Sequence, residues 1–430
     1  MTTWVTRLLY GFLLVLLLPA IFLVTHWRAL RQTRRPDNWL ERFAFIEPMP
    51  SGRVIWVHAA SLGEVQAAIP LVKSLQKLYP DCHLLLTAFT SAGVQRFQTV
   101  FQDHVRVTRF PYDLSSILIR FLNQTRPSCC VIVETEIWPN LFELLGKRNV
   151  PLVYASARLS DSSVRAYSKL GNFLRATMQN VSYVTAQTDE DATKFASLGV
   201  PGERIVVTGN LKFDLEIPAS SIERGRAIRA EWFANRRVFL AASTRVGEDE
   251  LVLSACRELC DARADASVII VPRHPERAAS IEQLARKQNF SVTLYSRVTT
   301  RPEGLLIVDT LGELLDFYSA ADLVFVGGSL VPLGGHNLVE PAALGLPILT
   351  GRYHFNAPTI ADELLRQGGL IMVNSERELA QEAIRLLDDN EKRAQLGEAA
   401  RVVVEKNRGS LESALQQVRQ VLPHYKRQGN

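Results

Sequence analysis

One carboxylate lies in a run of small residues that links a predicted strand, residues 53–57, to a helical pattern. The run reads Val57-His58-Ala59-Ala60-Ser61-Leu62-Gly63-Glu64-Val65. Because little bulk surrounds Glu64, a substrate could approach the turn and give a hydroxyl proton to the carboxylate. The first turn of a helix also favours an anion through the helix dipole, so Glu64 could be an ordinary structural residue. The segment alone leaves both interpretations open.

Two more carboxylates and a lysine follow later apolar runs. In Val133-Glu134-Thr135-Glu136-Ile137-Trp138-Pro139-Asn140, Glu134 continues a run that should be buried, so its charge needs partners there. That charge could serve catalysis or only be paired internally. Lys212, within Thr208-Gly209-Asn210-Leu211-Lys212-Phe213-Asp214, could stabilise a developing negative charge or be solvated.

The stretch 327–341 combines two glycine pairs with His336, Asn337 and Glu340. A helix start after Gly335 could bind an anion through its N–H groups, and His336 could add a donor to a phosphate. Glu340 could accept hydrogen bonds from two ribose hydroxyls. A glycine loop capped by Asn337 is the structural alternative. The four residue types together exceed what a turn needs, which favours a ligand site.

Three further loops could complete such a site. Pro272 and Arg273 end an apolar run in residues 271–277. An arginine in that position can hold phosphate or carboxylate through two hydrogen bonds. The loop 309–314 could present its backbone amides to a base or a sugar. The turn 242–248 carries hydroxyls and is explained equally well as a simple helix cap.

All these segments follow short apolar runs that alternate with helical patterns. The runs are continuously apolar, as expected for strands of a parallel sheet covered on both faces. Two such series, separated near residues 215–221, predict an α/β protein with two Rossmann-like domains facing a central cleft, with ligands at the carboxyl ends of the strands. The predicted strands are 54–57, 83–87, 105–109, 130–133, 152–154, 183–186 and 205–207, then 238–241, 267–271, 292–294, 305–308, 323–326, 347–349 and 370–373.

Residues 8–24 form an uninterrupted run of apolar or small residues, with Trp4 before it and Trp27 after it. This length and the two tryptophans predict a helix that spans a membrane. Arginines follow at positions 28, 31, 34, 35 and 42, and no signal-peptide cleavage site is visible. We therefore expect an uncleaved single-pass anchor that leaves the domains in the cytoplasm. A helix lying in the membrane interface is the alternative.

Length and composition agree with two folded domains behind such an anchor. The 430 residues are 47% hydrophobic and 22% charged, as in globular proteins. We expect a transmembrane anchor in residues 1–27, a basic juxtamembrane linker in 28–50, an acceptor domain in 51–217 and a nucleotide-binding domain in 218–430. The formal charge of +5 is concentrated near the N-terminus, which favours an anionic membrane surface over nucleic acid. The five cysteines form no metal-ligand or disulfide pattern and indicate a reducing compartment.

The chain resembles the Kdo transferases in six motifs, which stand here in family order: HAASLGEV, VETEIWPN, GNLKFD, PRHPER, DTLGEL and GGSLVPLGGHNLVEP. The resemblance spans nearly the whole region after the N-terminal run and implies the GT-B fold. It implies an inverting glycosyltransferase that moves 3-deoxy-D-manno-octulosonic acid (Kdo) from CMP-Kdo to a lipid A precursor, lipid IVA, in lipopolysaccharide synthesis. The implied place is the cytoplasmic face of the bacterial inner membrane. The implied partners are CMP-Kdo, the lipid A precursor and inner-membrane lipids, without nucleic acid, metal or cofactor.

By this resemblance Glu64 is the general base, while Glu134 and Lys212 stabilise the transition state. The resemblance assigns CMP binding to Pro272, Arg273, Leu311, Gly312, Glu313, Gly335, His336, Asn337, Leu338, Val339 and Glu340.

The chain departs from the family pattern at two places. The family commonly has Ser-Thr-His-Glu-Gly-Glu where this chain has Ser243-Thr244-Arg245-Val246-Gly247-Glu248, which leaves the roles of Arg245 and Val246 open. The family also often has a basic residue at position 333 and Pro-Leu-Glu at 338–340, where Glu340 keeps its place.

Two other interpretations stay open. One is another membrane-associated GT-B enzyme, such as a lipid-disaccharide synthase or a transferase that uses a UDP-sugar. The other is a tethered scaffold that binds a sugar nucleotide or a lipid without chemistry. The motifs do not encode the number of Kdo residues added, the acyl-chain preference, the oligomeric state or the extent of domain closure.

Overall fold

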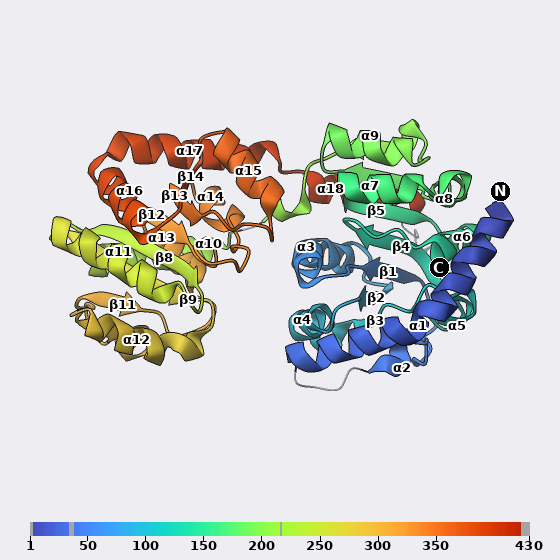
Figure 1. The fold of residues 1–430 in the computed structure, drawn as a ribbon, viewed down its shortest axis with the longest axis horizontal. Helices are drawn as coiled ribbons and strands as arrows, with labels where there is room; N and C mark the ends of the chain where they lie inside the picture. The colour runs from blue at the N-terminus through green and yellow to red at the C-terminus, as the bar shows by residue number, and fades with distance from the viewer. Residues whose placement is uncertain (1–2, 34–37, 216, 423–430) are drawn as a thin grey trace, which may run out of the picture. The chain divides into compact units, whose positions relative to one another are not determined.

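The computed structural model describes residues 3–33, 38–215 and 217–422 and divides the chain into two compact units (Figure 1). The unit called here the N-terminal domain comprises Met1–Asp214 and Asn407–Asn430. The C-terminal domain comprises Leu215–Lys406. Each contains a seven-stranded parallel sheet, and every predicted strand overlaps an observed one. The prediction of two Rossmann-like α/β domains is therefore confirmed.

The N-terminal sheet has the strand order β3-β2-β1-β4-β5-β6-β7. Its strands are β1 (Val54–His58), β2 (His83–Ala88), β3 (Arg106–Arg109), β4 (Pro127–Val133), β5 (Leu152–Ala157), β6 (Tyr183–Ala186) and β7 (Ile205–Val207). Strand β1 shows why the runs are continuous: Trp56 packs into one core layer, while Ile55 and Val57 pack into the other. The last residue of β1, His58, is fully buried although it is polar.

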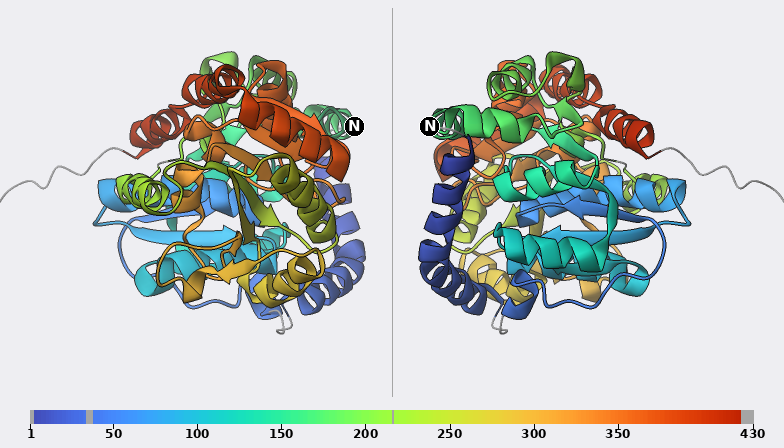
Figure 2. Two further views of the ribbon diagram at one scale, coloured as in Figure 1. Left: turned by 90° about the vertical axis from the view of Figure 1, so that its left-hand side faces the viewer. Right: turned by 90° about the vertical axis from the view of Figure 1, so that its right-hand side faces the viewer.

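Helices cover both faces of this sheet (Figure 2). Hydroxyl caps begin several of them directly after strands, as Ser61 does for α3 and Thr188 for α9. The helices are α1 (Thr3–Thr33), α2 (Trp39–Arg42), α3 (Leu62–Leu78), α4 (Ser91–Phe101), α5 (Ser115–Thr125), α6 (Pro139–Lys147), α7 (Asp161–Ser168), α8 (Gly171–Met178), α9 (Asp189–Ser197) and α18 (Ser410–Val421), with 3-10 turns η1 (Gln102–His104), η2 (Gly202–Arg204) and η3 (Leu211–Phe213).

The C-terminal sheet has the order β10-β11-β9-β8-β12-β13-β14. Its strands are β8 (Arg237–Thr244), β9 (Ala266–Pro272), β10 (Val292–Leu294), β11 (Leu305–Ile307), β12 (Leu323–Val326), β13 (Ile348–Gly351) and β14 (Leu370–Val373). The helices are α10 (Ala219–Trp232), α11 (Asp249–Ala262), α12 (Ala278–Lys287), α13 (Leu314–Ala320), α14 (Val339–Ala343), α15 (Pro358–Arg366), α16 (Glu376–Asp388) and α17 (Asn390–Lys406), with 3-10 turns η4 (Pro275–Arg277) and η5 (Tyr295–Arg297). In each sheet the order reverses beside the first strand, at β1/β4 and β8/β12, where doubly wound sheets bind ligands.

The last described helix, α18, packs with the N-terminal domain. Its side chains Ala414, Leu415 and Val418 are buried in the same core layer as Val57. The expected nucleotide-binding domain of residues 218–430 is therefore too long at its C-terminal end, because residues from Asn407 onward return to the first domain. An amphipathic pattern shows that a helix needs a core but not which core it joins.

The predicted single-pass anchor is wrong. Among the described residues, none of the helices combines the length and the apolarity needed to cross a membrane. The apolar run belongs to α1, which packs on α4 and α8 along the N-terminal domain (Figure 2). Arg7 forms an ion pair with Glu143, and the Tyr10 hydroxyl donates a hydrogen bond to Asp113 (2.8 Å). Hydropathy does not reveal these tertiary partners. The expected location, in which an inner-membrane anchor leaves the domains in the cytoplasm, depended on this anchor and is therefore not supported either.

The basic segment after the apolar run is only partly described. The side chains of Trp4, Arg28 and Arg31 lie outside the described residues, and so do Arg34 and Arg35 entirely. Arg42 is buried, and its guanidinium donates to the Phe89 carbonyl (2.7 Å). This arginine therefore stabilises the domain interior and does not face a surface.

Candidate active site

Glu64 begins α3 and forms a capping box with Ser61. The Ser61 hydroxyl oxygen accepts a hydrogen bond from the Glu64 backbone N–H (3.2 Å). In return Glu64 Oε2 accepts from the Ala60 N–H (2.6 Å) and the Ser61 N–H (3.4 Å). Glu64 therefore does have a structural role, which is to cap the N-terminus of α3. It engages Oε2, while Glu64 Oε1 takes part in no hydrogen bond among the described residues.

The pKa of Glu64 is raised to about 7. The main cause is burial, which disfavours the charged form, and the nearby carboxylates of Glu134 and Glu136 add to it. The Ala60 N–H and His58 oppose the shift. A carboxylate that titrates near neutral pH holds a proton more firmly than an ordinary one and is still substantially ionised, which suits a general base.

Glu134 follows β4 as a buried carboxylate with two cationic partners. Its Oε1 lies 2.7 Å from Lys212 Nζ, and its Oε2 lies 3.5 Å from Arg158 Nε. The first contact is an ion pair without hydrogen-bond alignment, since Oε1 makes no hydrogen bond. Glu134 has a φ of +68°, a left-handed conformation that is strained for a residue with a Cβ. The structure therefore brings together two residues, Glu134 and Lys212, that the sequence indicated separately.

A buried polar network fixes the turn η3 that carries Lys212. The Asn210 side chain caps this turn by accepting from the Lys212 N–H (2.9 Å), and it donates to Gln187 (3.0 Å). The Leu211 N–H donates to the Ser156 hydroxyl (3.2 Å). These contacts tie η3 to the ends of β5 and β6, so the lysine is held by the sheet and not by a mobile loop.

Sequence reasoning assigned no role to His58 or Glu136, which are joined in the structure. His58 Nε2 lies 2.8 Å from Glu136 Oε2. The available signal was a histidine at the end of a continuously apolar run, where a polar side chain needs a partner. Glu64 follows β1, and the two carboxylates that raise its pKa, Glu134 and Glu136, follow the neighbouring strand β4. These three residues are called here the carboxylate cluster.

In the C-terminal domain, Arg245, Arg273 and His274 surround His336. These three residues and burial together lower the pKa of His336 to about 4, with burial the largest cause. Arg245 Nη1 lies 3.5 Å from His274 Nε2. His336 is therefore neutral at physiological pH, and the positive charge of this group comes from its arginines. Such a group fits a phosphate or another anion.

Glu340 belongs to the same group. Burial raises its pKa, while the Asn337 side chain and Arg273 lower it. Asn337 Oδ1 also accepts from the Val339 N–H (3.0 Å) at the start of α14. The structure thus brings Arg273, His336, Asn337 and Glu340 close to one another.

The glycine stretch differs from its prediction in two ways. No helix starts after Gly335, because α14 begins at Val339, and the Gly335 N–H donates to the Gly328 carbonyl (2.8 Å). The N–H groups of Gly328, Ser329 and Leu330 donate to the buried carboxylate of Glu248. These amides are occupied and do not offer an anion site. Sequence reasoning missed this role of Glu248, which only the fold brings to the loop.

The predicted loop 309–314 shows no bond to the arginine and histidine group within the described part of the chain. Leu311 is 76% exposed, and a Cβ at Gly312, whose φ is +106°, would meet no atom within 4 Å. Glu313 accepts from the Thr310 hydroxyl (2.9 Å). Among the described residues, no hydrogen bond or ion pair joins residues 311–313 to His336 or Arg273. The open backbone here remains suited to contact a ligand.

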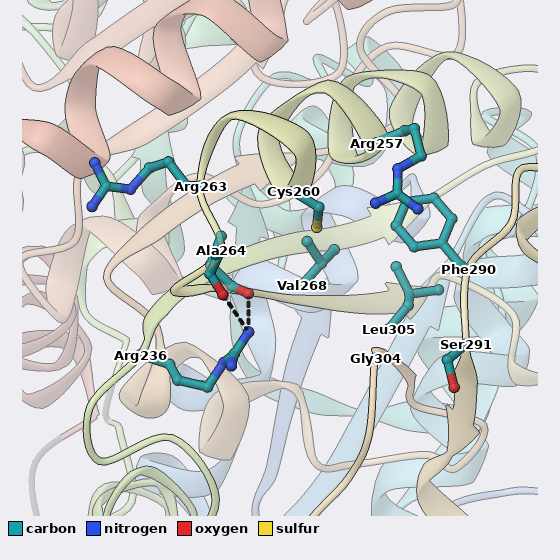
Figure 3. A pocket seen from close by; sticks show the side chains of 11 residues that line it. Arg236, Arg257, Cys260, Arg263, Ala264, Val268, Phe290, Ser291, Gly304 and Leu305 are labelled. Carbon is teal, nitrogen blue, oxygen red and sulfur yellow. Dashed lines mark hydrogen bonds between the residues drawn. The ribbon is translucent and has the colours of Figure 1, made fainter.

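A cavity of about 190 Å³ lies at the opposite edge of the C-terminal sheet, beside the first residues of β9 and β11 (Figure 3). Arg236, Arg257 and Arg263 line it. Each is engaged within the protein: Arg236 with the Ala264 and Ala266 carbonyls, Arg257 with Asp261, and Arg263 with Asp265 and Asp388. This cavity contains none of the predicted site residues.

Within the described part of the chain, no group of three or more histidine, cysteine, aspartate or glutamate side chains could hold a metal ion. Cys129, Cys130 and Cys256 are buried and behave as small apolar residues, and burial raises the pKa of Cys129 to about 12.

Comparison with known proteins identifies relatives along the whole chain. Residues 37–215 match the family model for 3-deoxy-D-manno-octulosonic-acid transferase (kdotransferase), and residues 249–403 match that for glycosyl transferases group 1. The 3-deoxy-D-manno-octulosonic acid transferase of Haemophilus influenzae is 37% identical over 416 residues, covering 95% of this chain and 97% of that protein. The protein of the same name from Bordetella pertussis is 34% identical over 390 residues, covering 86% and 90%.

Solved structures share the two-domain arrangement. A UDP-N-acetylglucosamine 2-epimerase has a TM-score of 0.53 at 16% identity, covering 89% of this chain and 99% of that chain. A glycosyltransferase from Rickettsia africae has a TM-score of 0.52 at 14% identity, covering 87% and 100%. At such identities the likeness concerns the fold alone, which is a GT-B-like pair of parallel-sheet domains.

Proposed function

The chain belongs to the Kdo transferase family of glycosyltransferases, and we propose that it transfers Kdo from CMP-Kdo to a hydroxyl of a lipid A precursor, lipid IVA, with inversion at the anomeric carbon. The observation that carries this proposal is the 37% identity to a Kdo transferase along 95% of the chain. The carboxylate cluster around Glu64 and the arginine and histidine group around His336 supply residue types that such a transfer needs.

Glu64 is the base in this proposal. An alcohol is much less acidic than a carboxylic acid, so its proton moves to Glu64 as the alcohol oxygen attacks the anomeric carbon. Base catalysis of this kind contributes about 10²–10⁴-fold. Glu64 Oε2 is engaged in the capping box, and we assign proton transfer to Oε1. One base and one displacement invert the configuration.

The leaving group is CMP. As the anomeric C–O bond breaks, its electron pair passes to the phosphate, whose growing charge must meet donors already in place. We assign this role to Arg273 and His336. His336 is neutral because its pKa is lowered to about 4, so it contributes a hydrogen bond, and Arg273 contributes the charge. Glu340 and the amides near Gly312 are assigned to the nucleoside, and Pro272, Gly335, Leu338 and Val339 shape the same site.

Glu134 and Lys212 act on the sugar in this proposal. The anomeric carbon becomes more positive as the leaving group departs, and a buried carboxylate stabilises that charge. The ion pair with Lys212 (2.7 Å) places a positive charge directly beside this buried carboxylate. We propose both as transition-state stabilisers and not as proton acceptors.

The test uses the purified full chain with CMP-Kdo and a tetra-acylated lipid A precursor. Mass spectrometry of the lipid is expected to show a gain of one or more Kdo residues, and NMR of the product an inverted anomeric centre. Glu64→Gln should lower the rate at least 100-fold, in line with the loss of a general base, and leave CMP affinity unchanged. The control is Glu203→Gln, which removes an exposed carboxylate on η2.

Two outcomes would refute the proposal. Use of a UDP-sugar in preference to CMP-Kdo would indicate a different glycosyltransferase. Binding of CMP-Kdo without any transfer would indicate a scaffold.

A further inference from the structure

Two arginines stand side by side at the carboxyl ends of the neighbouring strands β8 and β9. Thr244 and Pro272 are paired across these strands, so Arg245 and Arg273 are the residues that follow a matched pair. The Arg273 N–H also donates to the Thr244 carbonyl (3.1 Å). Because neighbouring strands are about 4.8 Å apart, the backbones of the two arginines lie next to one another.

An extra residue in β8 produces this pairing. The register of β8 against β9 shifts between Ala242 and Thr244, where β8 contains the additional residue Ser243. Ser243 is buried and has a φ of +58°, a left-handed conformation that is costly for a residue with a Cβ. An extra residue changes the face to which the following side chains point, and such bulges are common beside active sites. The chain therefore keeps a strained residue shortly before Arg245.

The Arg245 side chain approaches the group around His336. A Cβ added at Gly328 would lie 2.9 Å from His336 Cδ2 and 3.5 Å from Arg245 Cγ, so both side chains converge on one point. Arg245 Nη1 also lies 3.5 Å from His274 Nε2. Burial first, and then Arg273 and Arg245, lower the pKa of His336, which agrees with this proximity.

Neither Arg245 nor Arg273 forms an ion pair with an acid in the part of the chain that the structure describes. The acids that follow β8 are engaged elsewhere. Asp249 is paired with Arg277, and Glu248 accepts from backbone N–H groups, that of Arg245 (2.9 Å) among them. Both guanidinium groups are therefore able to bind anionic groups of a ligand.

The donor in the proposed function carries two anionic groups at its reacting end. Kdo is an octulosonic acid, in which the carboxylate carbon is bonded directly to the anomeric carbon. In CMP-Kdo the anomeric carbon also bears the phosphate oxygen. The phosphate and the carboxylate are therefore close neighbours, and two adjacent arginines can hold both of them.

We propose that Arg245 binds the carboxylate of the donor sugar, while Arg273 binds the phosphate. The proposal rests on the proposed function, in which CMP-Kdo is the donor, and it adds a contact that selects an acidic sugar. Holding both groups of the anomeric carbon fixes the direction of the bond that breaks, which aligns it for displacement. Arg245 thereby has a role at a position where the chain departs from the family pattern.

The test compares the binding of CMP and CMP-Kdo by calorimetry at about pH 8, without a lipid acceptor. Both ligands then carry about two negative charges, because the second pKa of a phosphate monoester is about 6 and the second charge of CMP-Kdo is its carboxylate. A general loss of positive charge should therefore weaken both ligands equally. Arg245→Gln should instead weaken CMP-Kdo at least about tenfold, the scale of a lost charged hydrogen bond, and leave CMP affinity nearly unchanged.

Two further variants provide the comparison. Arg273→Gln should weaken CMP and CMP-Kdo by similar factors, because both ligands contain the phosphate. Arg226→Gln removes an exposed arginine on α10 and should change neither affinity. Retained CMP binding in Arg245→Gln shows that the site of this variant is folded.

Equal weakening of CMP and CMP-Kdo in Arg245→Gln would place this arginine on the phosphate and overturn its assignment to the carboxylate. Unchanged affinity for both ligands would remove Arg245 from donor binding altogether. Either result leaves the proposed function in place, because the wild type still binds CMP-Kdo. A wild-type protein that does not bind CMP-Kdo would refute the proposed function and this inference with it.

Discussion

Replacing Lys212 by methionine should destabilise the N-terminal domain by removing the closest cationic partner of the buried Glu134. The side chain of Glu134 is 4% exposed, and its Oε1 lies 2.7 Å from Lys212 Nζ. Breaking a fully buried ion pair by removing one partner costs about 3–5 kcal/mol. Lys212 is 24% exposed, and Arg158 remains at 3.5 Å, so part of the charge stays compensated. We therefore expect a loss of about 2–3 kcal/mol, below the fully buried range.

The assay is a double-mutant cycle in urea, followed by tryptophan fluorescence. Trp56 and Trp138 are in the N-terminal domain near the site, and the C-terminal domain contributes Trp232, so Trp232→Phe is introduced in every variant to make the signal report the N-terminal domain. Glu134→Gln alone should cost less than Lys212→Met, because the half-buried Lys212 can still reach solvent, whereas Glu134 cannot. The double variant should recover most of the loss, giving a coupling energy above about 1.5 kcal/mol. Equal stability of Lys212→Met and wild type, or a double variant as unstable as Lys212→Met, would show that Glu134 does not need the lysine.

Four further outcomes are expected. The rate of transfer should rise with pH through a midpoint near 7, because Glu64, whose pKa is raised to about 7, accepts a proton only when ionised; a flat profile between pH 5.5 and 8.5 would exclude it as the base. Arg273→Ala should weaken CMP binding by calorimetry at least tenfold, about 1.4 kcal/mol, and unchanged affinity would remove Arg273 from the site. Glu248→Gln should speed amide hydrogen exchange in residues 328–330, whose N–H groups donate to that carboxylate. Exchange as slow as in the wild type would contradict this role. Tyr10→Phe should lower the free energy of unfolding by about 1–2 kcal/mol, because it removes one donor to the buried Asp113. Proteolysis of α1 should then be faster, and a wild-type rate of proteolysis would mean that this hydrogen bond does not hold α1.

The fold is predictable because the signal for it is local. Each strand of a parallel sheet covered on both faces reads as a continuous apolar run, and the turn after it reads as small or polar residues. Glu134 and Arg273 directly follow a strand, and Glu64 lies in the first turn of the helix after β1, so the parallel sheets alone place them at the carboxyl ends. The sequence therefore predicts the edge of the sheet at which each of these side chains lies.

Pairing between distant segments is not predictable in the same way. The contact of Glu134 with Lys212 joins the end of β4 to η3, and the contact of Glu248 with Gly328 joins two loops of the other domain. In each case the sequence shows a group that needs a partner and leaves the partner unnamed. The glycine stretch predicts an anion site only if its amides are free, and a carboxylate of the same protein already occupies them.

Hydropathy fails at α1 for a related reason. A window average counts Arg7 and Tyr10 only as small penalties in an apolar run, although each has a specific partner on the N-terminal domain. The property that separates a docked helix from a spanning one is the presence of those partners, which lie more than a hundred residues away in sequence. An apolar run of borderline length therefore needs tertiary information before it is assigned to a membrane.

The two interpretations of Glu64 that the sequence leaves open do not exclude one another. The capping box requires one carboxylate oxygen, and Oε2 alone supplies it by accepting from Ala60 and Ser61. The same bonds fix the rotamer, so Oε1 is held in one place without entropy loss during a reaction. The Ala60 hydrogen bond lowers the pKa, while burial and the neighbouring carboxylates raise it to about 7. A capping residue that is buried near two other carboxylates thus becomes both rigid and basic. On this argument Ser61→Ala, which removes only the other half of the capping box, should slow transfer through lost positioning and leave the pH midpoint nearly unchanged.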